Sequence, residues 1–164
     1  MINNYPIVNV YEKNSSKSKL SSQLIYGEKF QILKKKKDWL KIRTSNDKYT
    51  GFIKKKNFLK SIKITHKVSS LSAKLYSKPK GKFLIRTKLP FCSKISVTEI
   101  KNNFYKFGNY WIKKNNIVPI NYKQQIFKDI KMFRNIPYKW GGKTFKGIDC
   151  SALVQVFFEF NNLY

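Results

Sequence analysis

The chain contains two stretches in which hydrophobic and polar residues alternate with a period of two, the spacing of half-buried β-strands. In the first stretch the alternating hydrophobic residues are Phe30, Ile32, Leu40 and Ile42. Gly27, Asp38 and Gly51 interrupt this pattern at positions that favour turns. We therefore expect a meander of short strands, each of about 5 residues.

The second stretch repeats the first at a constant offset. Residues 24–42, LIYGEKFQILKKKKDWLKI, align with residues 89–107, LPFCSKISVTEIKNNFYKF. The pairs that match in type are Leu24 with Leu89, Tyr26 with Phe91, Phe30 with Ile95, Ile32 with Val97, Trp39 with Phe104, Leu40 with Tyr105, and Ile42 with Phe107. Self-similarity of this kind indicates a repeated structural unit. Because closure removes exposed strand edges, we expect two small β-barrels.

The motifs of the first copy, GE at 27–28, WLKI at 39–42 and YTGFI at 49–53, resemble the bacterial SH3-like domain. That domain usually ends in a G-W-I/V motif. Phe52 stands at the tryptophan position of the first copy, whereas the second copy has Trp111 without the glycine before it. The resemblance implies a wall-binding or substrate-shaping accessory, and a structural spacer without a ligand is the alternative.

Residues 60–82 separate the two copies and are rich in serine and lysine, with Pro79 and Gly81 near their end. This composition predicts a linker and loops. His66, the only histidine of the chain, lies here. We expect it to be a surface residue without a catalytic role, because no partner clusters with it.

After Pro119 the alternation stops. Residues 123–134 place Ile126, Phe127, Ile130 and Phe133 at helical spacing, which predicts a short amphipathic helix. A glycine-containing loop follows Pro137, and a second helix is expected to begin at Asp149. That helix is apolar on almost all sides, as in a helix that is buried, so a third module begins here.

The formal net charge of +27, from 35 Lys+Arg against 8 Asp+Glu, would attract any polyanion, including anionic cell-wall polymers. Only three of these cations are arginine, the residue that reads guanine and clamps phosphate. The chain has two alanines and many residues that AT-rich codons specify. The charge is therefore interpreted mainly as a solvated surface, and nucleic acid is not the expected partner.

Cys92 and Cys150 do not have the spacing of a zinc site, and we expect no metal or cofactor. The first residues lack the basic start and apolar run of a signal peptide, which favours a cytoplasmic location. The cell envelope or secretion is the alternative location. No stretch approaches the roughly 18 apolar residues that a membrane-spanning helix needs.

Cys150 is expected in the first turn of the second helix, capped by Asp149. The partial positive charge of a helix start stabilises a thiolate, and its free N–H groups can stabilise an oxyanion. Two interpretations remain open from the residues alone. Cys150 is either a nucleophile or a small buried apolar residue.

The stretch PYKWGGKTFKGIDCSALVQ at 137–155 closely resembles the signature of the NlpC family of cell-wall cysteine peptidases, with Ala152 in place of a glycine. The resemblance implies a papain-like fold and hydrolysis of peptidoglycan stem peptides, often between D-glutamate and a diamino acid. It implies these roles: Cys150 as the nucleophile, Asp149 and Ser151 as substrate-binding residues, Tyr138 as an oxyanion stabiliser, and Trp140, Gly141 and Gly142 as loop-shaping residues.

A cysteine nucleophile needs a base, normally a histidine, and no histidine follows Cys150. We therefore expect the N-terminal part of a longer enzyme that is inactive on its own. The expected architecture is mainly β and then α+β, with SH3-like barrels at 1–62 and 63–120 and the start of a papain-like domain at 121–164. The alternative functions are a non-catalytic wall-binding module and, less favoured, a polyanion or nucleic-acid binder.

Overall fold

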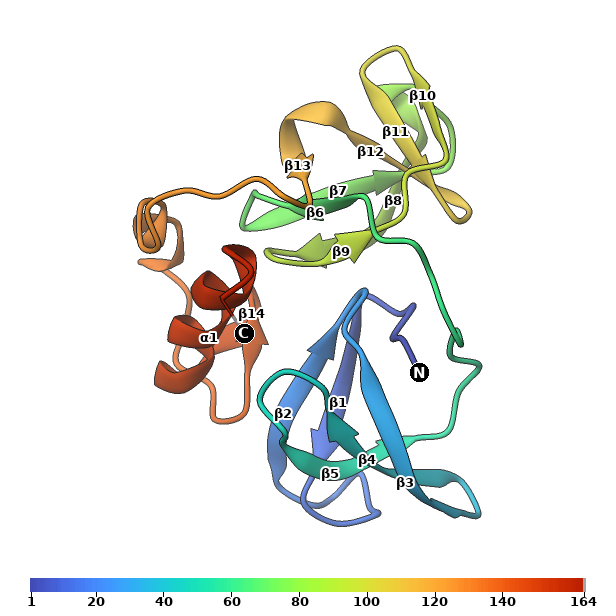
Figure 1. The fold of residues 1–164 in the computed structure, drawn as a ribbon, viewed down its shortest axis with the longest axis vertical. Helices are drawn as coiled ribbons and strands as arrows, with labels where there is room; N and C mark the ends of the chain where they lie inside the picture. Colours follow the sequence, from blue (N-terminus) through green and yellow to red (C-terminus); the bar gives the residue numbers. More distant parts are fainter. Residues whose placement is uncertain (164) are drawn as a thin grey trace.

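The first repeat forms a five-stranded antiparallel sheet with the strand order β2-β1-β5-β4-β3 (Figure 1). The computed structural model describes residues 1–163 of the chain. The strands are β1 (Ile7–Tyr11), β2 (Leu20–Ile25), β3 (Phe30–Lys36), β4 (Trp39–Thr44) and β5 (Thr50–Lys54). Alternate residues point inward, so Val10, Ile42 and Ile53 are fully buried in the barrel core.

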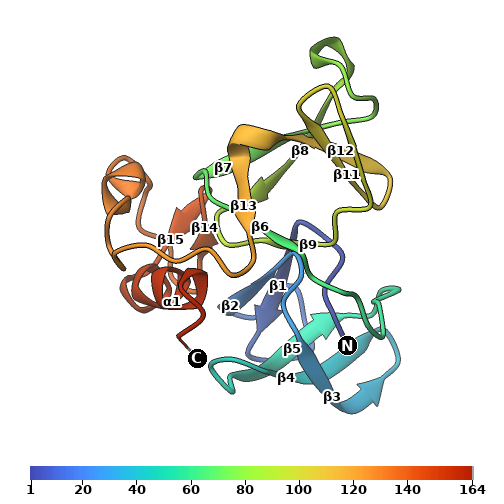
Figure 2. The same ribbon diagram turned by 45° about the horizontal axis from the view of Figure 1, so that its top comes forward.

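The second repeat forms a sheet with the equivalent strand order, which is β8-β7-β12-β11-β10 when it is read from the corresponding edge. Its strands are β7 (Ser72–Tyr76), β8 (Leu84–Pro90), β10 (Glu99–Lys101), β11 (Phe104–Phe107) and β12 (Tyr110–Lys113). Strands β4 and β11 begin at Trp39 and Phe104, two residues that the sequence alignment pairs. The predicted pair of SH3-like β-barrels is confirmed (Figure 2).

The prediction that residues 60–82 form a linker and loops is wrong. This segment contains β7 and also β6 (His66–Val68), which lies between β13 (Ile117–Pro119) and β9 (Lys94–Ile95) in a three-stranded sheet. Val68, Ala73 and Leu75 are fully buried. In β7, Ser72 and Lys74 alternate with the buried Ala73 and Leu75 and are more exposed than they are. This short alternation was hidden by a composition that is typical of loops.

The remaining elements are short apart from one α-helix. They are the 3₁₀ turns η1 (Gly81–Phe83), η2 (Lys114–Asn116) and η3 (Ile130–Phe133), the strands β14 (Lys143–Thr144) and β15 (Gly147–Ile148), and the helix α1 (Cys150–Phe160). Strands β14 and β15 pair in an antiparallel hairpin that leads directly into α1. No helix among residues 1–163 has the length and apolar character needed to span a membrane.

The predicted α-helix at 123–134 is also wrong, because only η3 and neighbouring turns form there. Five N–H groups bond to the carbonyl three residues earlier, which is 3₁₀ geometry; they belong to Lys128, Ile130, Met132, Arg134 and Ile136. The segment has no side-chain cap at the start of η3 and is short for an isolated helix. Its hydrophobic residues still reach the core, with Phe133 buried against Phe157.

Helix α1 packs against both barrels. Phe157 and Phe160 are fully buried, and Phe160 stacks on Phe91 of the second barrel with ring centroids 4.7 Å apart. Ile25 of the first barrel belongs to the same hydrophobic cluster. The two barrels themselves supply the surface that covers this apolar helix (Figures 1 and 2).

Buried charged residues also join the three parts. Glu28 of the first barrel and Glu159 of α1 lie on either side of the Lys143 ammonium, which is bonded to Glu28 and is 3.6 Å from Glu159. Lys94 of the second barrel bonds to Glu159 at 2.7 Å. Because an unpaired charge is costly to bury, these four residues favour one arrangement of the barrels around α1.

Candidate active site

Asp149 caps the start of α1 and ties it to the preceding loop. Its Oδ1 accepts hydrogen bonds from the Ala152 N–H and the Ser151 hydroxyl, both at 2.8 Å. Its Oδ2 accepts from the Gly141 N–H at 3.0 Å. One carboxylate therefore fixes both the first turn of the helix and the loop beside it.

Cys150 is the first residue of α1 and is exposed. Its position beside the unpaired N–H groups of the first turn is the one in which a helix favours a negative charge. The other cysteine, Cys92, is only 1% exposed, and burial raises the pKa of its thiol. Of the two thiols, only that of Cys150 can reach a substrate.

The loop that precedes the helix depends on two glycines that approach backbone closely. Gly141 has a φ of +65°, and a Cβ there would come within 2.9 Å of the Leu20 carbonyl oxygen at the start of β2. A Cβ on Gly142 would come within 2.5 Å of the Gly147 carbonyl oxygen. The loop is thus held between the first barrel and its own hairpin, with no room for a side chain at either glycine.

Tyr138 and Trp140 project from this loop into solvent, with 65% and 68% of their surface exposed. Neither ring has a hydrogen bond or an aromatic contact among residues 1–163. The loop-shaping role expected of Trp140 therefore does not come from contacts of its indole within the loop. Backbone bonds replace it, including that from the Gly142 N–H to the Lys139 carbonyl at 2.9 Å.

Ser151 is exposed at the same helix start, where its hydroxyl donates to Asp149. Asp149, Cys150 and Ser151 are therefore brought together as the sequence pattern implied, in a single helical turn. Tyr138 lies next to them through its bridge to Ile148, the residue before Asp149. Their roles toward a substrate stay predictions.

His66 does not join this site. It lies in β6 of the second barrel, where its ring contacts the Thr65 hydroxyl at 2.9 Å and packs on Tyr105. Burial lowers the pKa of this histidine. Its expected place in a linker was wrong, but it has no contact with the start of α1 among the described residues.

Sequence reasoning missed Lys143 and Glu159. Lys143 belongs to the loop motif but is buried, and its backbone N–H donates to the Gln23 Oε1 in β2 at 2.9 Å. Glu159 lies in the last turn of α1 and also accepts from the Asn46 side chain. The single acidic residue in a strongly apolar helix was the available signal, because such a charge needs a buried partner.

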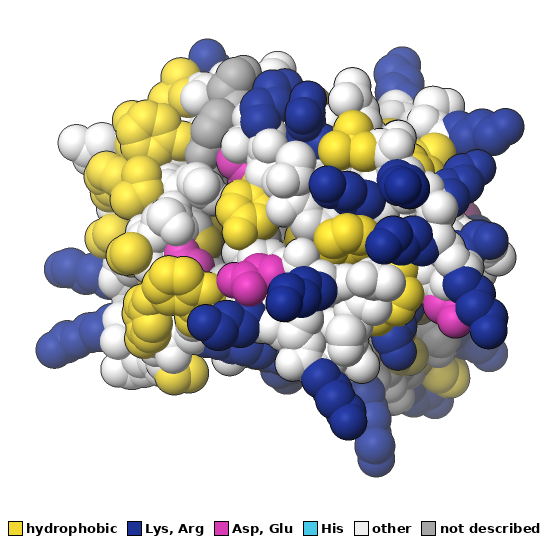
Figure 3. Space-filling model, turned by 90° about the horizontal axis from the view of Figure 1, so that it is seen from below, with side chains coloured by type: hydrophobic (Ala, Val, Ile, Leu, Met, Phe, Trp, Pro, Cys, Tyr) yellow, Lys and Arg dark blue, Asp and Glu magenta, His cyan; other side chains and the backbone are white. Residues whose placement is uncertain are grey.

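Exposed hydrophobic side chains concentrate on the part of the chain that carries Cys150. Those in this part are Tyr122, Phe127, Ile130, Tyr138, Trp140, Val154 and Leu163. The two barrels expose others, among them Leu33, Leu84 and Ile100. Figure 3 shows hydrophobic side chains on its left, where the third part lies, and mainly lysine and arginine on its right. The loop that precedes Cys150 therefore exposes two aromatic side chains, Tyr138 and Trp140.

Residues 8–59 match the family described as Bacterial SH3 domain, and residues 135–164 match the NlpC/P60 family. A gamma-D-glutamyl-L-lysine dipeptidyl-peptidase from Bacillus subtilis (strain 168) is 24% identical over 163 residues, covering 87% of this chain and 53% of that protein. The protein of the same name from Bacillus cereus (strain ATCC 10987 / NRS 248) is 25% identical over 171 residues, covering 87% and 50%. The chain spans about half the length of these curated relatives.

The crystal structure of an NlpC/P60 family protein from Bacillus cereus ATCC 10987 has the same fold. The TM-score is 0.80 at 15% identity, with 98% of this chain and 72% of that chain covered. This likeness includes both barrels and the segment that carries Cys150. The chain is therefore similar to the bacterial SH3 domain over residues 8–59 and to the NlpC/P60 family over residues 135–164.

Proposed function

We propose that this chain supplies the nucleophile and accessory barrels of a peptidoglycan-peptide hydrolase that cuts the bond between γ-D-glutamate and a diamino acid. The observation that carries the proposal is the exposed Cys150 at the start of α1, capped by Asp149. The peptidase names of its relatives and the NlpC/P60 match support the reaction class.

The chemistry assigned to Cys150 is attack of its thiolate on the scissile carbonyl. The sulfur forms a bond to carbon, and the carbonyl oxygen gains the negative charge of the tetrahedral intermediate. The N–H groups of the first helical turn that are not used by Asp149 can stabilise that charge. Tyr138 is the side chain of the adjacent loop that is free to donate a further hydrogen bond, from its exposed hydroxyl.

Asp149 and Ser151 are proposed to contact the substrate as well as to shape the site. Asp149 Oδ1 accepts two hydrogen bonds and Oδ2 accepts one, so Oδ2 can accept a further bond from a substrate N–H. The Ser151 hydroxyl is exposed and uses its proton on Asp149, so its lone pairs can accept from a peptide N–H.

Hydrolysis also needs a group that removes the thiol proton and later protonates the leaving amine. The chain has one histidine, His66, and its contacts lie within the second barrel. We therefore expect no turnover when the purified chain is incubated with a γ-D-glutamyl-diaminopimelate peptide. Measurable cleavage that disappears in Cys150→Ala would overturn this expectation.

An affinity label tests the nucleophile without requiring turnover. In a γ-D-glutamyl chloromethyl ketone, thiolate attack forms a carbon–sulfur bond and releases chloride. We expect one adduct per chain, mapped to Cys150 by peptide mass spectrometry, and faster labelling than with the matched α-L-glutamyl chloromethyl ketone. Equal labelling rates for the two reagents would contradict a site that recognises γ-D-glutamyl peptides.

A further inference from the structure

A cleft separates the first barrel from the hairpin that precedes α1. It has a volume of about 390 Å³, and its walls come from β1, β2, the end of β5 and the segment around β14 and β15. The residues that line it are Ile7, Val8, Asn9, Tyr11, Gln23, Lys54, Lys56, Lys139 and Lys146. This volume lies within the range of small-molecule sites.

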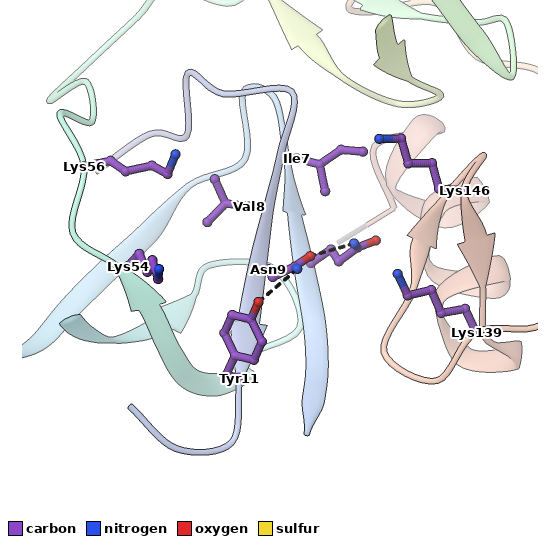
Figure 4. Close-up of a pocket in the computed structure, with 9 residues that line it drawn as sticks. Ile7, Val8, Asn9, Tyr11, Lys54, Lys56, Lys139 and Lys146 are labelled. Atoms are coloured by element: carbon purple, nitrogen blue, oxygen red, sulfur yellow. Dashed lines mark hydrogen bonds between the residues drawn. The ribbon is translucent and has the colours of Figure 1, made fainter. Parts of the chain in front are cut away.

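Four lysines converge on this cleft from opposite sides. Figure 4 shows the Lys146 side chain reaching in from the β14–β15 hairpin, that of Lys139 from the loop before it, and that of Lys56 from across β1. No acidic residue lines the cleft, and none of the four lysines has an ion pair among residues 1–163. A cleft lined by one sign of charge concentrates counter-ions, which a flat surface with the same charge does much less.

The positive region continues into a second cleft of about 580 Å³. The two clefts share Ile7, Lys56 and Lys146, and the second adds Arg86 and Lys88 from β8 of the second barrel. Phe145 also lines it, and the Lys88 ammonium lies 5.9 Å from the centroid of that ring. Together the clefts form a cationic groove where the three parts of the chain meet.

Unpaired lysines are common in this chain, so the case for a site depends on how these ones are held. The Lys56 ammonium lies 4.4 Å from the Tyr5 ring centroid, a cation–π contact that orients it. The aliphatic stem of Lys139 lies against Gly147, where a Cβ would come within 2.5 Å of the Lys139 Cβ. The Lys56 ammonium and the stem of Lys139 are therefore positioned before any ligand arrives.

A chain of hydrogen bonds on the cleft wall ends in a free donor. The Lys143 N–H can only donate, so it fixes the Gln23 Oε1 as its acceptor. The Gln23 amide group must then donate to Asn9 Oδ1 at 2.9 Å, and the Asn9 amide group to the Tyr11 hydroxyl oxygen at 3.1 Å. The Tyr11 hydroxyl thus accepts within the wall, and its own proton is available to a ligand (Figure 4).

We infer that this cleft binds a compact oxyanion ligand that carries two or more phosphate or carboxylate groups. Lysine ammonium groups neutralise such a ligand at several points, and the Tyr11 hydroxyl donates one directed hydrogen bond to it. The inference does not depend on the proposed peptidase activity, because the residues given a chemical role there, Tyr138, Asp149, Cys150 and Ser151, do not line the cleft.

Isothermal titration calorimetry at fixed ionic strength tests this site, with pyrophosphate as the phosphate probe and citrate as the carboxylate probe. We expect saturable binding of one equivalent to the wild-type chain. The probe that binds more tightly identifies the preferred group. A heat signal that grows linearly with either probe and does not saturate would overturn the inference.

Variants distinguish binding in this cleft from attraction to the net positive charge of the chain. Tyr11→Phe keeps the ring contact with Trp39, at 5.7 Å, and should weaken binding several-fold. The double variant Lys139→Gln/Lys146→Gln should weaken it about tenfold or more. The matched control Lys60→Gln/Lys101→Gln removes the same charge from exposed positions outside the cleft and should change little. Equal weakening in both double variants would show that only net charge matters.

Discussion

The two cysteines of the chain occupy opposite environments. Cys150 is exposed at a helix start, whereas Cys92 is buried in the hydrophobic cluster that joins the second barrel to α1. Burial raises the pKa of the Cys92 thiol, which keeps it protonated at neutral pH. Sequence alone left open which interpretation applied to Cys150, and its exposure excludes that of a small buried apolar residue.

Alkylation should therefore distinguish the two residues. With iodoacetamide at neutral pH, the folded chain should gain one carbamidomethyl group, on Cys150, and a second only after denaturation. Intact-mass and peptide mass spectrometry measure this. The Cys150→Ser variant should gain none while folded. Modification of Cys92 at a similar rate in the folded chain would contradict the burial of this thiol.

At the scale of elements, Asp149 connects the helix to the loop before it through three accepted hydrogen bonds. The sequence predicted the start of α1 at this residue because Asp149 is a favoured N-cap residue and the apolar run of a helix follows it directly. The prediction failed for β6, where the composition indicated a linker, and for the segment 123–134, where the periodicity indicated an α-helix. In both segments tertiary packing determined the structure. Val68 and Leu75 became strand core despite a loop-like composition.

Removal of the cap gives an element-scale prediction. Asp149→Ala should lower the free energy of unfolding by about 1–2 kcal/mol, because the Ala152 and Gly141 N–H groups lose their acceptor. Urea denaturation followed by circular dichroism measures this. Ser151→Ala leaves both backbone bonds in place and should cost less than about 0.5 kcal/mol. A cost for Ser151→Ala as large as for Asp149→Ala would contradict the cap.

At the scale of the whole molecule, buried charges determine how the barrels and α1 fit together. Glu28, Lys94, Lys143 and Glu159 come from three parts of the chain. The repeat predicted the barrels, but nothing local distinguishes Lys94 or Lys143 from the other cations among 35. The junction therefore could not be predicted from one sequence, since its partners lie far apart along the chain.

Loss of the shared carboxylate should destabilise this junction. Glu159→Ala leaves Lys94 and Lys143 without their common partner, and we expect unfolding to become easier by about 3–5 kcal/mol. Glu99→Ala is the matched control, because its ion pair with Lys106 is exposed and should contribute little. Similar urea midpoints for the two variants would contradict the proposed role of the network.

Lys67 gives a pH-dependent prediction at the same junction. Its buried ammonium donates to the Phe160 and Tyr122 carbonyls, and burial lowers its pKa from 10.5 to about 8. Between these two pH values the unfolded chain binds more protons at this residue than the folded chain does. The free energy of unfolding therefore rises as the pH is raised from about 8 to 10.5. This gain is lost as the pH falls through the same range to about 8.

The Lys67→Met variant isolates this contribution, because it keeps the length of the side chain and cannot titrate. The free energy of unfolding of the wild type relative to the variant should rise between pH 8 and pH 10.5. Urea denaturation across this range measures it. A difference that stays constant with pH would show that Lys67 titrates normally in the folded chain.

The central claim is that Cys150 is the nucleophile of a γ-D-glutamyl peptide hydrolase. The direct test is a chimera in which this chain replaces the matching half of the Bacillus subtilis dipeptidyl-peptidase, assayed on a γ-D-glutamyl-L-lysine peptide. Its thermal unfolding, compared with that of the Cys150→Ala chimera, verifies that both are folded. We predict release of the lysine-containing product that disappears in Cys150→Ala. A folded chimera without activity, or with activity that survives Cys150→Ala, would contradict the claim.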